Sequence, residues 1–392
     1  MVGMILPDAP WRHRAGLDRL AEVLGSGEAR FVGGAVRDTL LGLDVADVDV
    51  ATRHKPEDVV DLLKRAGIKV VPTGLKHGTV TAVIESGPVE VTTLRRDVET
   101  DGRHATVAFT DDWREDAARR DFTMNALYAD TRTGEIFDYF GGQADLEARH
   151  VRFIGDPLQR IAEDHLRILR FFRFLARFGE VADPAALEAC RSRAKDLMAL
   201  SRERIADELL KLLVAKDAVH VVAMMIERGI FAPVLPEITD AGPLAHLAAR
   251  ETETGIAPDP IRRLAALLPP GTTDPVGARL KFSRLQRRRL DAAKLAPEGN
   301  AHALAYHAGV ESAVDRLLLS DRPLAELEVQ HWTRPRFPLT GGAIVARGIK
   351  AGPDVARLLH EAESRWVAEG FPDAARAEAI ADAVVAQATG RS

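Results

Sequence analysis

The sequence GGAVRDTLLGLDVADVDVAT, residues 33–52, decides the fold of the N-terminal part of the chain. A short strand begins at Arg30 and ends at the two glycines, and a helix is expected over 35–41. Carboxylates and valines then alternate over 45–51, and this period of two predicts a second strand. Two strands that are joined by a glycine turn and a helix predict a small α/β unit.

Two carboxylates in the second predicted strand, Asp47 and Asp49, lie two residues apart. Side chains at this spacing share one face of a strand, so the intervening valines are expected to face the core. Two carboxylates on one open face suit Mg²⁺, which prefers oxygen ligands and serves phosphoryl transfer. Glu90 lies in the middle of a later predicted strand and is the candidate third carboxylate. Solvent-exposed strand faces are the other interpretation of all three residues.

The glycine pair that precedes these carboxylates resembles a phosphate-binding turn. Gly33 and Gly34 let the backbone approach a phosphate, and the helix after them presents free N–H groups. Arg37 lies one turn into that helix and can pair with phosphate oxygens. An ordinary turn would explain the glycines alone, but their place before two strand carboxylates favours a phosphate site.

Outside this stretch, the first part of the chain mixes helices with strands, and the rest is helical. Helices are expected at 16–24 and 56–66, and strands at 78–85, 88–94, 135–139 and 151–154. Residues 97–112 are polar and aperiodic, so a loop is expected there. After residue 156, helices are expected at 157–178, 185–199, 202–215, 218–229, 260–268, 276–295, 301–318 and 354–367. The predicted fold class is α+β, a small α/β head with a mixed sheet followed by helices.

The composition excludes several classes of protein. A chain of 392 residues with 46% hydrophobic residues can bury a large core and is expected to form two to four domains. A net charge of −5 means that a nucleic-acid partner would need a local basic surface. A single cysteine, Cys190, excludes a disulfide framework and a cysteine-rich zinc site. The N-terminus has no long apolar run, so no membrane span is expected and a cytoplasmic location is predicted.

Five stretches resemble, in the same order, the motifs of class II CCA-adding enzymes and bacterial poly(A) polymerases, members of the DNA polymerase β nucleotidyltransferase superfamily. The first is GGAVRDTLLGLDVADVDVAT, quoted above. The others are ARRDFTMNALYAD (118–130), FDYFGGQADLEARHVRFIGDP (137–157), EDHLRILRFFRF (163–174) and SRERIADELLKLL (201–213). The resemblance implies a catalytic head over 1–150, a helical neck over 151–215 and an RNA-binding body and tail over 216–392.

The resemblance also implies Mg²⁺ as cofactor, CTP and ATP as substrates and the 3′ end of tRNA as partner. Asp47 and Asp49 would hold the metal, while Gly34 and Arg37 would bind the triphosphate. Arg120, with Asp121 beside it, matches the nucleotide-contacting part of the second motif. A surface ion pair of Arg119 and Arg120 with Glu115 and Asp116 is the alternative interpretation.

The predicted helix 157–178 carries Asp164, Arg167 and Arg170 at steps of three, on one side of the helix. A carboxylate can accept from the exocyclic amine of cytosine or adenine, and a guanidinium can donate to the adjacent ring acceptor. Uracil and guanine present a carbonyl there, so a site of this kind would reject them. The resemblance assigns this role to Asp164 and Arg167, although the two could simply pair with each other. Arg170 and Arg173 would serve the phosphates or brace Asp164.

A basic stretch, KFSRLQRRRLDAAK at 281–294, is expected to form a helix in the last part of the chain. Its arginines could follow an RNA backbone or form a solvated helix face, and they are Arg284, Arg287, Arg288 and Arg289. Poly(A) addition, CC-only addition and A-only addition remain alternatives to full CCA addition. A glycosyltransferase would explain Asp47 and Asp49 but not the later motifs. A non-catalytic RNA-binding relative would be expected to lose one of these carboxylates.

Overall fold

The computed structural model describes residues 4–100 and 105–390, and their contacts divide the chain into two compact units. The first unit is Met1–Thr239 and the second is Asp240–Ser392. The limits expected at residues 150 and 215 both fall inside the first unit and stay a prediction. No helix in the described part of the chain is long and apolar enough to cross a membrane.

A mixed sheet of seven strands forms the centre of the first unit. Strands β2 and β5 run parallel, and the other neighbouring strands run antiparallel. This confirms the α+β class and the mixed sheet of the head. In spatial order the strands are β3 (Lys69–Gly74), β4 (Thr79–Ile84), β5 (Gly87–Thr93), β2 (Asp49–Thr52), β1 (Ala29–Val32), β8 (Leu127–Asp130) and β9 (Ile136–Asp138).

The strand expected over 45–51 is shorter than predicted, because β2 begins only at Asp49. Asp47 therefore precedes the strand, and the strand pairing of β2 does not include it. The alternation nevertheless persists, since Val48 and Val50 are buried and the two aspartates are exposed. The parallel pairing of β2 with β5 places Asp49 directly beside Glu90.

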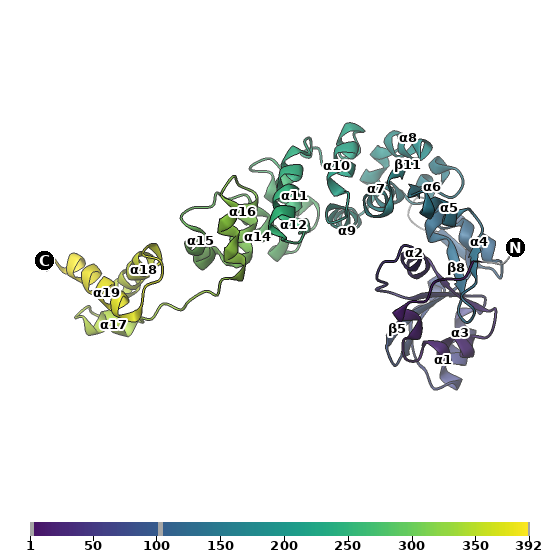
Figure 1. The fold of residues 1–392 in the computed structure, drawn as a ribbon, viewed down its shortest axis with the longest axis horizontal. Helices are drawn as coiled ribbons and strands as arrows, with labels where there is room; N and C mark the ends of the chain where they lie inside the picture. The colour runs from purple at the N-terminus through teal and green to yellow at the C-terminus, as the bar shows by residue number, and fades with distance from the viewer. Residues whose placement is uncertain (1–3, 101–104, 391–392) are drawn as a thin grey trace. The chain divides into compact units, whose positions relative to one another are not determined.

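Helices pack around this sheet, and Figure 1 shows α1 and α3 close to one another beside it. Pro56 opens α3, where a missing N–H costs nothing because the first helical N–H groups have no partner. Gly142 opens α5 where a Cβ would lie 2.3 Å from the carbonyl oxygen of Thr123, so only glycine fits. The head helices are α1 (Leu17–Leu24), α2 (Gly34–Leu40), α3 (Pro56–Arg65), α4 (Trp113–Ala118) and α5 (Gly142–Glu147), with 3₁₀ turns η1 (Pro10–His13), η2 (Leu75–His77) and η3 (Thr123–Asn125).

The prediction of a loop over 97–112 is wrong for most of this stretch. Strands β6 (Arg95–Thr100) and β7 (Ala105–Phe109) pair with each other in a separate antiparallel sheet. Polar and charged residues make up most of β6, so the sequence of this strand shows no apolar alternation. A third small sheet joins β10 (His150–Val151) to β11 (Val181–Ala182).

The single helix expected over 157–178 is also wrong, because two helices occupy this stretch. They are α6 (Pro157–Glu163) and α7 (Arg167–Phe178), and Asp164 lies between them with extended backbone angles of −149° and 109°. Its side chain accepts a hydrogen bond from the backbone N–H of Leu166 at 3.1 Å. Such a local bond competes with helical bonding and ends α6 at this position.

An aromatic cluster packs α7 against the head. The ring of Phe122 lies 5.0 Å from Phe153 and 4.9 Å from Phe174, and Phe153 stacks on Phe171 at 5.6 Å. Buried rings thus fix the position of α7, and Arg167 and Arg170 of this helix line the polar cleft described below. The remaining helices of the unit are α8 (Pro184–Ser192), η4 (Ala194–Ala199), α9 (Arg202–Leu213) and α10 (Ala218–Glu227).

The second unit is helical, as predicted, but with more breaks. The helix expected over 276–295 is interrupted before Ser283, whose side chain forms a capping box with Gln286. The helix expected over 301–318 is interrupted at Gly309. The helices are α11 (Gly242–Thr254), α12 (Pro260–Leu267), α13 (Thr273–Arg279), α14 (Arg284–Ala293), α15 (Ala301–Ala308), α16 (Val310–Leu318), η5 (Leu324–His331), α17 (Gly341–Ala346), α18 (Pro353–Ala368) and α19 (Ala374–Thr389).

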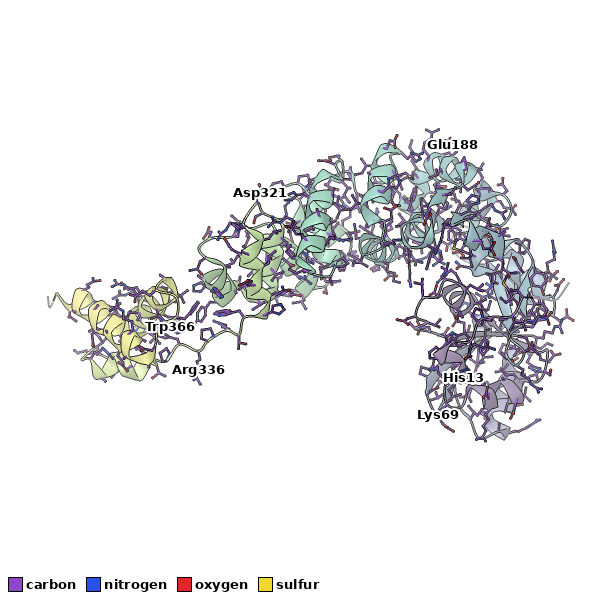
Figure 2. All side chains as sticks on the ribbon, viewed as in Figure 1. His13, Lys69, Glu188, Asp321, Arg336 and Trp366 are labelled. Carbon is purple, nitrogen blue, oxygen red and sulfur yellow. The ribbon has the colours of Figure 1, made fainter. Side chains whose placement is uncertain are left out.

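Two apolar clusters hold the second unit together. One joins α15 and α16 through buried residues such as Leu304 and Leu317. The other joins α17, α18 and α19 around Trp366, which is labelled in Figure 2. Tyr306 from α15 belongs to this second cluster.

Candidate active site

A polar cleft of about 470 Å³ lies at the end of β1 and the start of β2, two central strands of the sheet in the first unit. It is lined by residues from the β1–α2 turn, the start of β2, the segment around α4 and η3, and the α6–α7 break. The lining residues are Gly33, Gly34, Arg37, Asp49, Arg95, Arg119, Arg120, Asp121, Asn125, Asp164, Arg167, Arg170 and Phe174. Six arginines and three aspartates among them suit an anion that also carries hydrogen-bonding groups.

The glycine turn forms one wall of this cleft. Gly33 adopts φ 66° and ψ −119°, which glycine tolerates and a side chain does not, and α2 begins directly after it. Arg37 is buried to 7% exposure and donates to Asp38 at 2.7 Å and to Asn125 Oδ1 at 2.5 Å. Burial lowers the pKa of Arg37, while the charge of Asp38 opposes this effect. The structure thus places Gly34 and Arg37 together at the cleft, as the sequence predicted.

The carboxylates lie at the start of β2 and on β5. Asp49 lines the cleft, Glu90 is its neighbour in the ladder, and Asp47 precedes it. Desolvation raises the pKa of Asp49, and the charges of Glu90 and Asp47 act in the same direction. Neither a hydrogen bond nor an ion pair joins these three side chains to a cation in the described part of the chain. The charge of Arg120 partly offsets that of Asp49, although no ion pair joins the two side chains.

The donor set of these carboxylates fits a hard divalent cation but does not enclose it. Among the side chains that the structure describes, no three His, Cys, Asp or Glu residues gather closely enough to hold a metal ion. Mg²⁺ is commonly held by one or two carboxylates together with substrate phosphates. An open site of this kind would complete its coordination with the oxygens of a bound triphosphate.

A buried carboxylate, Asp116, aims two arginines at the cleft. It accepts from Arg119 at 2.8 Å, from Arg120 at 3.0 Å and from the hydroxyl of Tyr128 at 2.6 Å. Burial alone would raise the pKa of Asp116, but the two arginines and the hydrogen bonds hold it well below its usual range. The ion pairs with Asp116 that the sequence suggested as an alternative are therefore present, whereas Glu115 forms none with these two arginines. Both arginines nevertheless line the cleft.

Asp121 lines the cleft with its carboxylate already engaged. It accepts from the backbone of Phe122 and from Asn125, both at 2.9 Å, and from Arg170 at 2.8 and 2.6 Å. Burial would raise the pKa of Asp121, but the charge of Arg170 and these hydrogen bonds lower it to about 2. Asp121 thus orients Arg170 and Asn125, which in turn contacts Arg37.

The α6–α7 break brings Asp164 and Arg167 to the cleft without pairing them. Arg167 donates to Glu163 at 2.6 Å, to the carbonyl of Arg160 at 3.0 Å and to that of Arg119 at 2.9 Å. The oxygens of Asp164 accept instead from Arg204 of α9, at 3.1 and 2.8 Å. The interpretation in which Asp164 and Arg167 only neutralise each other is wrong.

Arg173 does not reach the cleft, in contrast to the prediction. Its Nε donates to Glu208 at 2.5 Å, while Glu208 lies 3.7 Å from Arg170. Neither Arg170 nor Arg173 contacts Asp164, so the brace of that side chain is Arg204 and not the arginines of α7. Arg204 belongs to a quoted motif, but its distance of 40 positions in sequence gave no sign of this contact.

Other lining residues were not singled out from the sequence. Asn125 lies inside the second quoted motif, but nothing in the sequence distinguished it from its neighbours. Phe174 looked like a core residue of an apolar helix, and most of it is indeed buried. Arg95 lies beside the stretch that was expected to be a loop, and no periodicity marked it.

The four arginines of α14, in the second unit, differ in their surroundings. Arg284 and Arg288 are exposed, and no ion pair joins them to another described residue. Arg287 contacts Asp274 at 2.5 Å. Arg289 contacts the buried Asp315 at 2.8 Å, as well as Asp259 and Glu311 at 3.0 Å each, so it anchors the helix.

Two family models match the chain. Residues 29–152 match the Poly A polymerase head domain, and residues 182–241 match a segment described as the probable RNA and SrmB-binding site of polymerase A. The sheet, the glycine turn and the polar cleft all lie within or next to the first match. The fold and the cleft therefore define a nucleotidyltransferase.

Known proteins that are similar to nearly the whole chain define its family more narrowly. The mitochondrial CCA tRNA nucleotidyltransferase 1 of Danio rerio is 37% identical over 90% of this chain and 86% of its own length. The human protein of the same name is 36% identical over 91% of this chain and 87% of its own, and the CCA-adding enzyme of Levilactobacillus brevis is 30% identical over 88% and 91%. The chain belongs to the family of CCA-adding tRNA nucleotidyltransferases.

Solved structures agree with this assignment. The CCA-adding enzyme of Bacillus stearothermophilus in complex with CTP is 28% identical, with a TM-score of 0.77 over 98% of this chain and 99% of that one. The Thermotoga maritima enzyme complexed with tRNA shares the fold at 19% identity, with a TM-score of 0.71 over 98% and 100%.

Proposed function

We propose that this chain adds C, C and A to the 3′ end of tRNA, without a template, using CTP, ATP and Mg²⁺. One observation carries the proposal: Asp49, six arginines and the remaining hydrogen-bonding positions of Asp164 and Arg167 all meet in one cleft. A nucleoside triphosphate has a phosphate end and a hydrogen-bonding base end, and the cleft offers a complementary group for each. The names of the relatives over nearly the whole chain support the choice of tRNA.

The reaction is a displacement at phosphorus. The 3′ hydroxyl oxygen of the RNA bonds to the α-phosphorus of the nucleotide, and the bond from that phosphorus to the β-bridging oxygen breaks. Pyrophosphate leaves with the electron pair, and the hydroxyl proton passes to solvent. Arg37 and Arg120 are oriented in advance by buried partners, so they can neutralise the triphosphate without reorganising.

Asp47 and Asp49 would hold the magnesium ion, with Glu90 beside them as the predicted third carboxylate. The ion supplies positive charge near the reacting phosphate and makes the hydroxyl a better nucleophile. Burial raises the pKa of Asp49 and the charges of Glu90 and Asp47 raise it further, so a cation beside these carboxylates would stabilise their charged forms.

Asp164 and Arg167 would read the edge of the incoming base. A guanidinium carries five N–H donors, and three of those on Arg167 are engaged within the protein, so two remain. Arg204 holds the Asp164 carboxylate from one side and leaves lone pairs for the exocyclic amine of cytosine or adenine. Asp121 serves Arg170 rather than the nucleotide itself.

The chain would be organised as a head over 1–150, a neck over 151–215 and a body with a tail over 216–392. Arg284 and Arg288 of α14 would contact RNA, and Arg289 would not. Poly(A), CC-only and A-only addition use the same chemistry and differ in their product. A cytoplasmic location stays a prediction, because the names of the fish and human relatives include the word mitochondrial.

The test uses tRNA that ends before its last three nucleotides, with each labelled nucleotide supplied alone. CTP should label the tRNA, ATP should label it only after two C residues are present, and UTP and GTP should not. Asp49→Asn should abolish labelling while tRNA binding persists. Labelling by ATP alone in long tracts would mean poly(A) addition, and an active Asp49→Asn would remove the carboxylate site from the mechanism.

A further inference from the structure

A second pocket of the first unit is lined by the end of α2, by α5 and its following turn, and by the N-terminal segment (Figure 1). Its volume is about 320 Å³, and it shares no lining residue with the cleft. The apolar part of its lining consists of Met4, Leu40, Leu41 and Leu146. An apolar lining with a few polar groups is typical of sites for small molecules, so this pocket can enclose the apolar part of a small ligand.

Backbone hydrogen bonds hold the apolar walls of this pocket in place. The carbonyl of Met4 accepts from the N–H of Ile136 at 2.9 Å, which fixes the N-terminal segment beside β9. At the end of α2, the N–H of Leu41 donates to the carbonyl of Arg37 at 3.1 Å. Leu146 of α5 is buried. The pocket is therefore formed before any ligand enters, and a ligand would not have to order it.

The three polar residues of the lining lack partners within the protein. The Oε1 atom of Gln143 is buried and accepts no hydrogen bond from any residue that the structure describes. Glu147 and Arg149 form no ion pair, either with each other or elsewhere in the described part of the chain. A buried acceptor without a partner is costly, and a ligand that donates a hydrogen bond would remove this cost.

Arg149 has an unusual backbone conformation. It is the second residue after α5 and adopts φ 52°, in the left-handed region that favours glycine. Glycine occupies the same position after α2, α3 and α10, as Gly42, Gly67 and Gly229. The backbone is thus strained at the residue that supplies the positive charge of the pocket, and strain of this kind is common where a side chain contacts a ligand.

We infer that this pocket binds a free α-amino acid with an apolar side chain. The carboxylate of the amino acid would pair with Arg149, and its ammonium group would donate to Gln143 Oε1 and to Glu147. The apolar side chain would lie among the leucines. Each polar group of the lining then has a partner of the right kind, since an ammonium group carries donors only and a carboxylate acceptors only.

Other classes of small ligand match the lining less completely. An apolar carboxylic acid would leave Gln143 Oε1 and Glu147 without a donor, and an apolar amine would leave Arg149 without an acceptor. A nucleotide or another polyanion would face Glu147 with one cation to bind it, because Arg149 alone among the lining residues is basic. A zwitterion with one apolar branch remains.

The first experiment compares ligands by isothermal titration calorimetry with the full, unaltered chain. L-leucine should bind. Glycine, which lacks the apolar branch, should bind about tenfold more weakly or worse. Isocaproate and isoamylamine, which are leucine without its ammonium group and without its carboxylate, should each lose about tenfold or more. Saturating CTP should leave the affinity for leucine unchanged, because the pocket and the cleft are lined by different residues.

The second experiment changes the polar lining. Arg149→Gln should weaken leucine binding about tenfold, while Glu147→Gln, at an exposed residue, should weaken it about twofold to fivefold. Arg149→Gly should also lose binding, yet it should melt at no lower temperature than the unaltered chain, because glycine tolerates φ 52°. Melting thus separates loss of the site from loss of the fold.

The matched control is Arg65→Gln, which removes an exposed arginine from the end of another helix of this unit, α3. It should bind leucine as the unaltered chain does. Four results would overturn the inference: no binding of leucine, equal binding of isocaproate or isoamylamine, displacement of leucine by CTP, or an equal effect of Arg149→Gln and Arg65→Gln. None of these measurements involves nucleotide addition, so each outcome is independent of the proposed function.

Discussion

At the scale of single residues, Asp164 and Arg167 are held in place by different partners, although both are proposed to recognise the base. Arg204 and the backbone of Leu166 occupy one side of its carboxylate, while the other side belongs to the cleft. Arg167 is fixed independently, by Glu163 and by two backbone carbonyls. Because the two side chains do not pair, each can offer its own hydrogen bond to a base.

Replacing Asp164 by Ala should reduce discrimination more than it reduces chemistry. The acceptor for the exocyclic amine is lost, and one charged hydrogen bond contributes about 1.5–3 kcal/mol. The preference for CTP over UTP should therefore fall roughly ten- to a hundredfold. Single-nucleotide addition with CTP, ATP, UTP and GTP, each alone, measures this. Equal slowing with all four nucleotides would make Asp164 a structural residue.

Arg204 is predicted to position Asp164 without touching the nucleotide. Arg204→Gln should free the carboxylate and lower the preference for CTP over UTP about threefold to tenfold, less than Asp164→Ala does. Arg204→Lys should restore part of the preference, because it keeps the charge and loses the fixed geometry. A variant that changes thermal stability but leaves the ratio of the two nucleotides unchanged would contradict this role.

The residues of the site could be predicted where a local motif contained them. Asp49, Gly34, Arg37, Arg120, Asp164 and Arg167 all reach the cleft as expected. The sequence indicated the ion pair of Asp116 with the two arginines but not the role of Arg204, whose contact with Asp164 spans 40 positions. Arg173 does not line the cleft, and its predicted role at the nucleotide stays a prediction.

At the scale of elements, apolar periodicity found most helices but not their breaks. The spacing of apolar residues continues from α6 into α7 and from α13 into α14, so a single helix was expected in each case. The breaks come from polar side chains that bond to the nearby backbone, at Asp164 and at Ser283. Such bonds leave little trace in a hydrophobic pattern.

Helix α14 is predicted to contact RNA through two arginines only. Arg284 and Arg288 lie four residues apart, and both are exposed, while Arg289 is fixed by three carboxylates. Arg284→Gln combined with Arg288→Gln should lower the salt slope of tRNA binding by roughly 1.4 to 1.8 units and leave the fold intact.

The matched control for α14 is Arg357→Gln combined with Arg376→Gln. These two arginines are also exposed in the second unit, and each contacts a surface carboxylate. Salt titrations of tRNA binding compare the two double variants directly. Identical slopes would show that α14 is a solvated helix face.

At the scale of the whole molecule, the fold class followed from the motifs between residues 33 and 213 and from the helical periodicity after residue 156. The mixed sheet, the glycine turn and the helical second unit were all expected, and the structure contains them. The division into Met1–Thr239 and Asp240–Ser392 could not be foreseen, because it depends on which helices contact one another. The boundary itself falls in the stretch APVLPEITDAGP at 232–243, whose prolines and glycine are typical of a break between helices.

The measurement that tests the central claim most directly is the sequence of the product made with all four nucleotides present at equal concentration. The substrate is tRNA that ends before its last three nucleotides, and the enzyme is the unaltered chain. The account predicts that nearly every extended molecule ends in C, C and A, and that addition then stops. Tracts of A, products that stop after two C residues, or frequent U and G would contradict it.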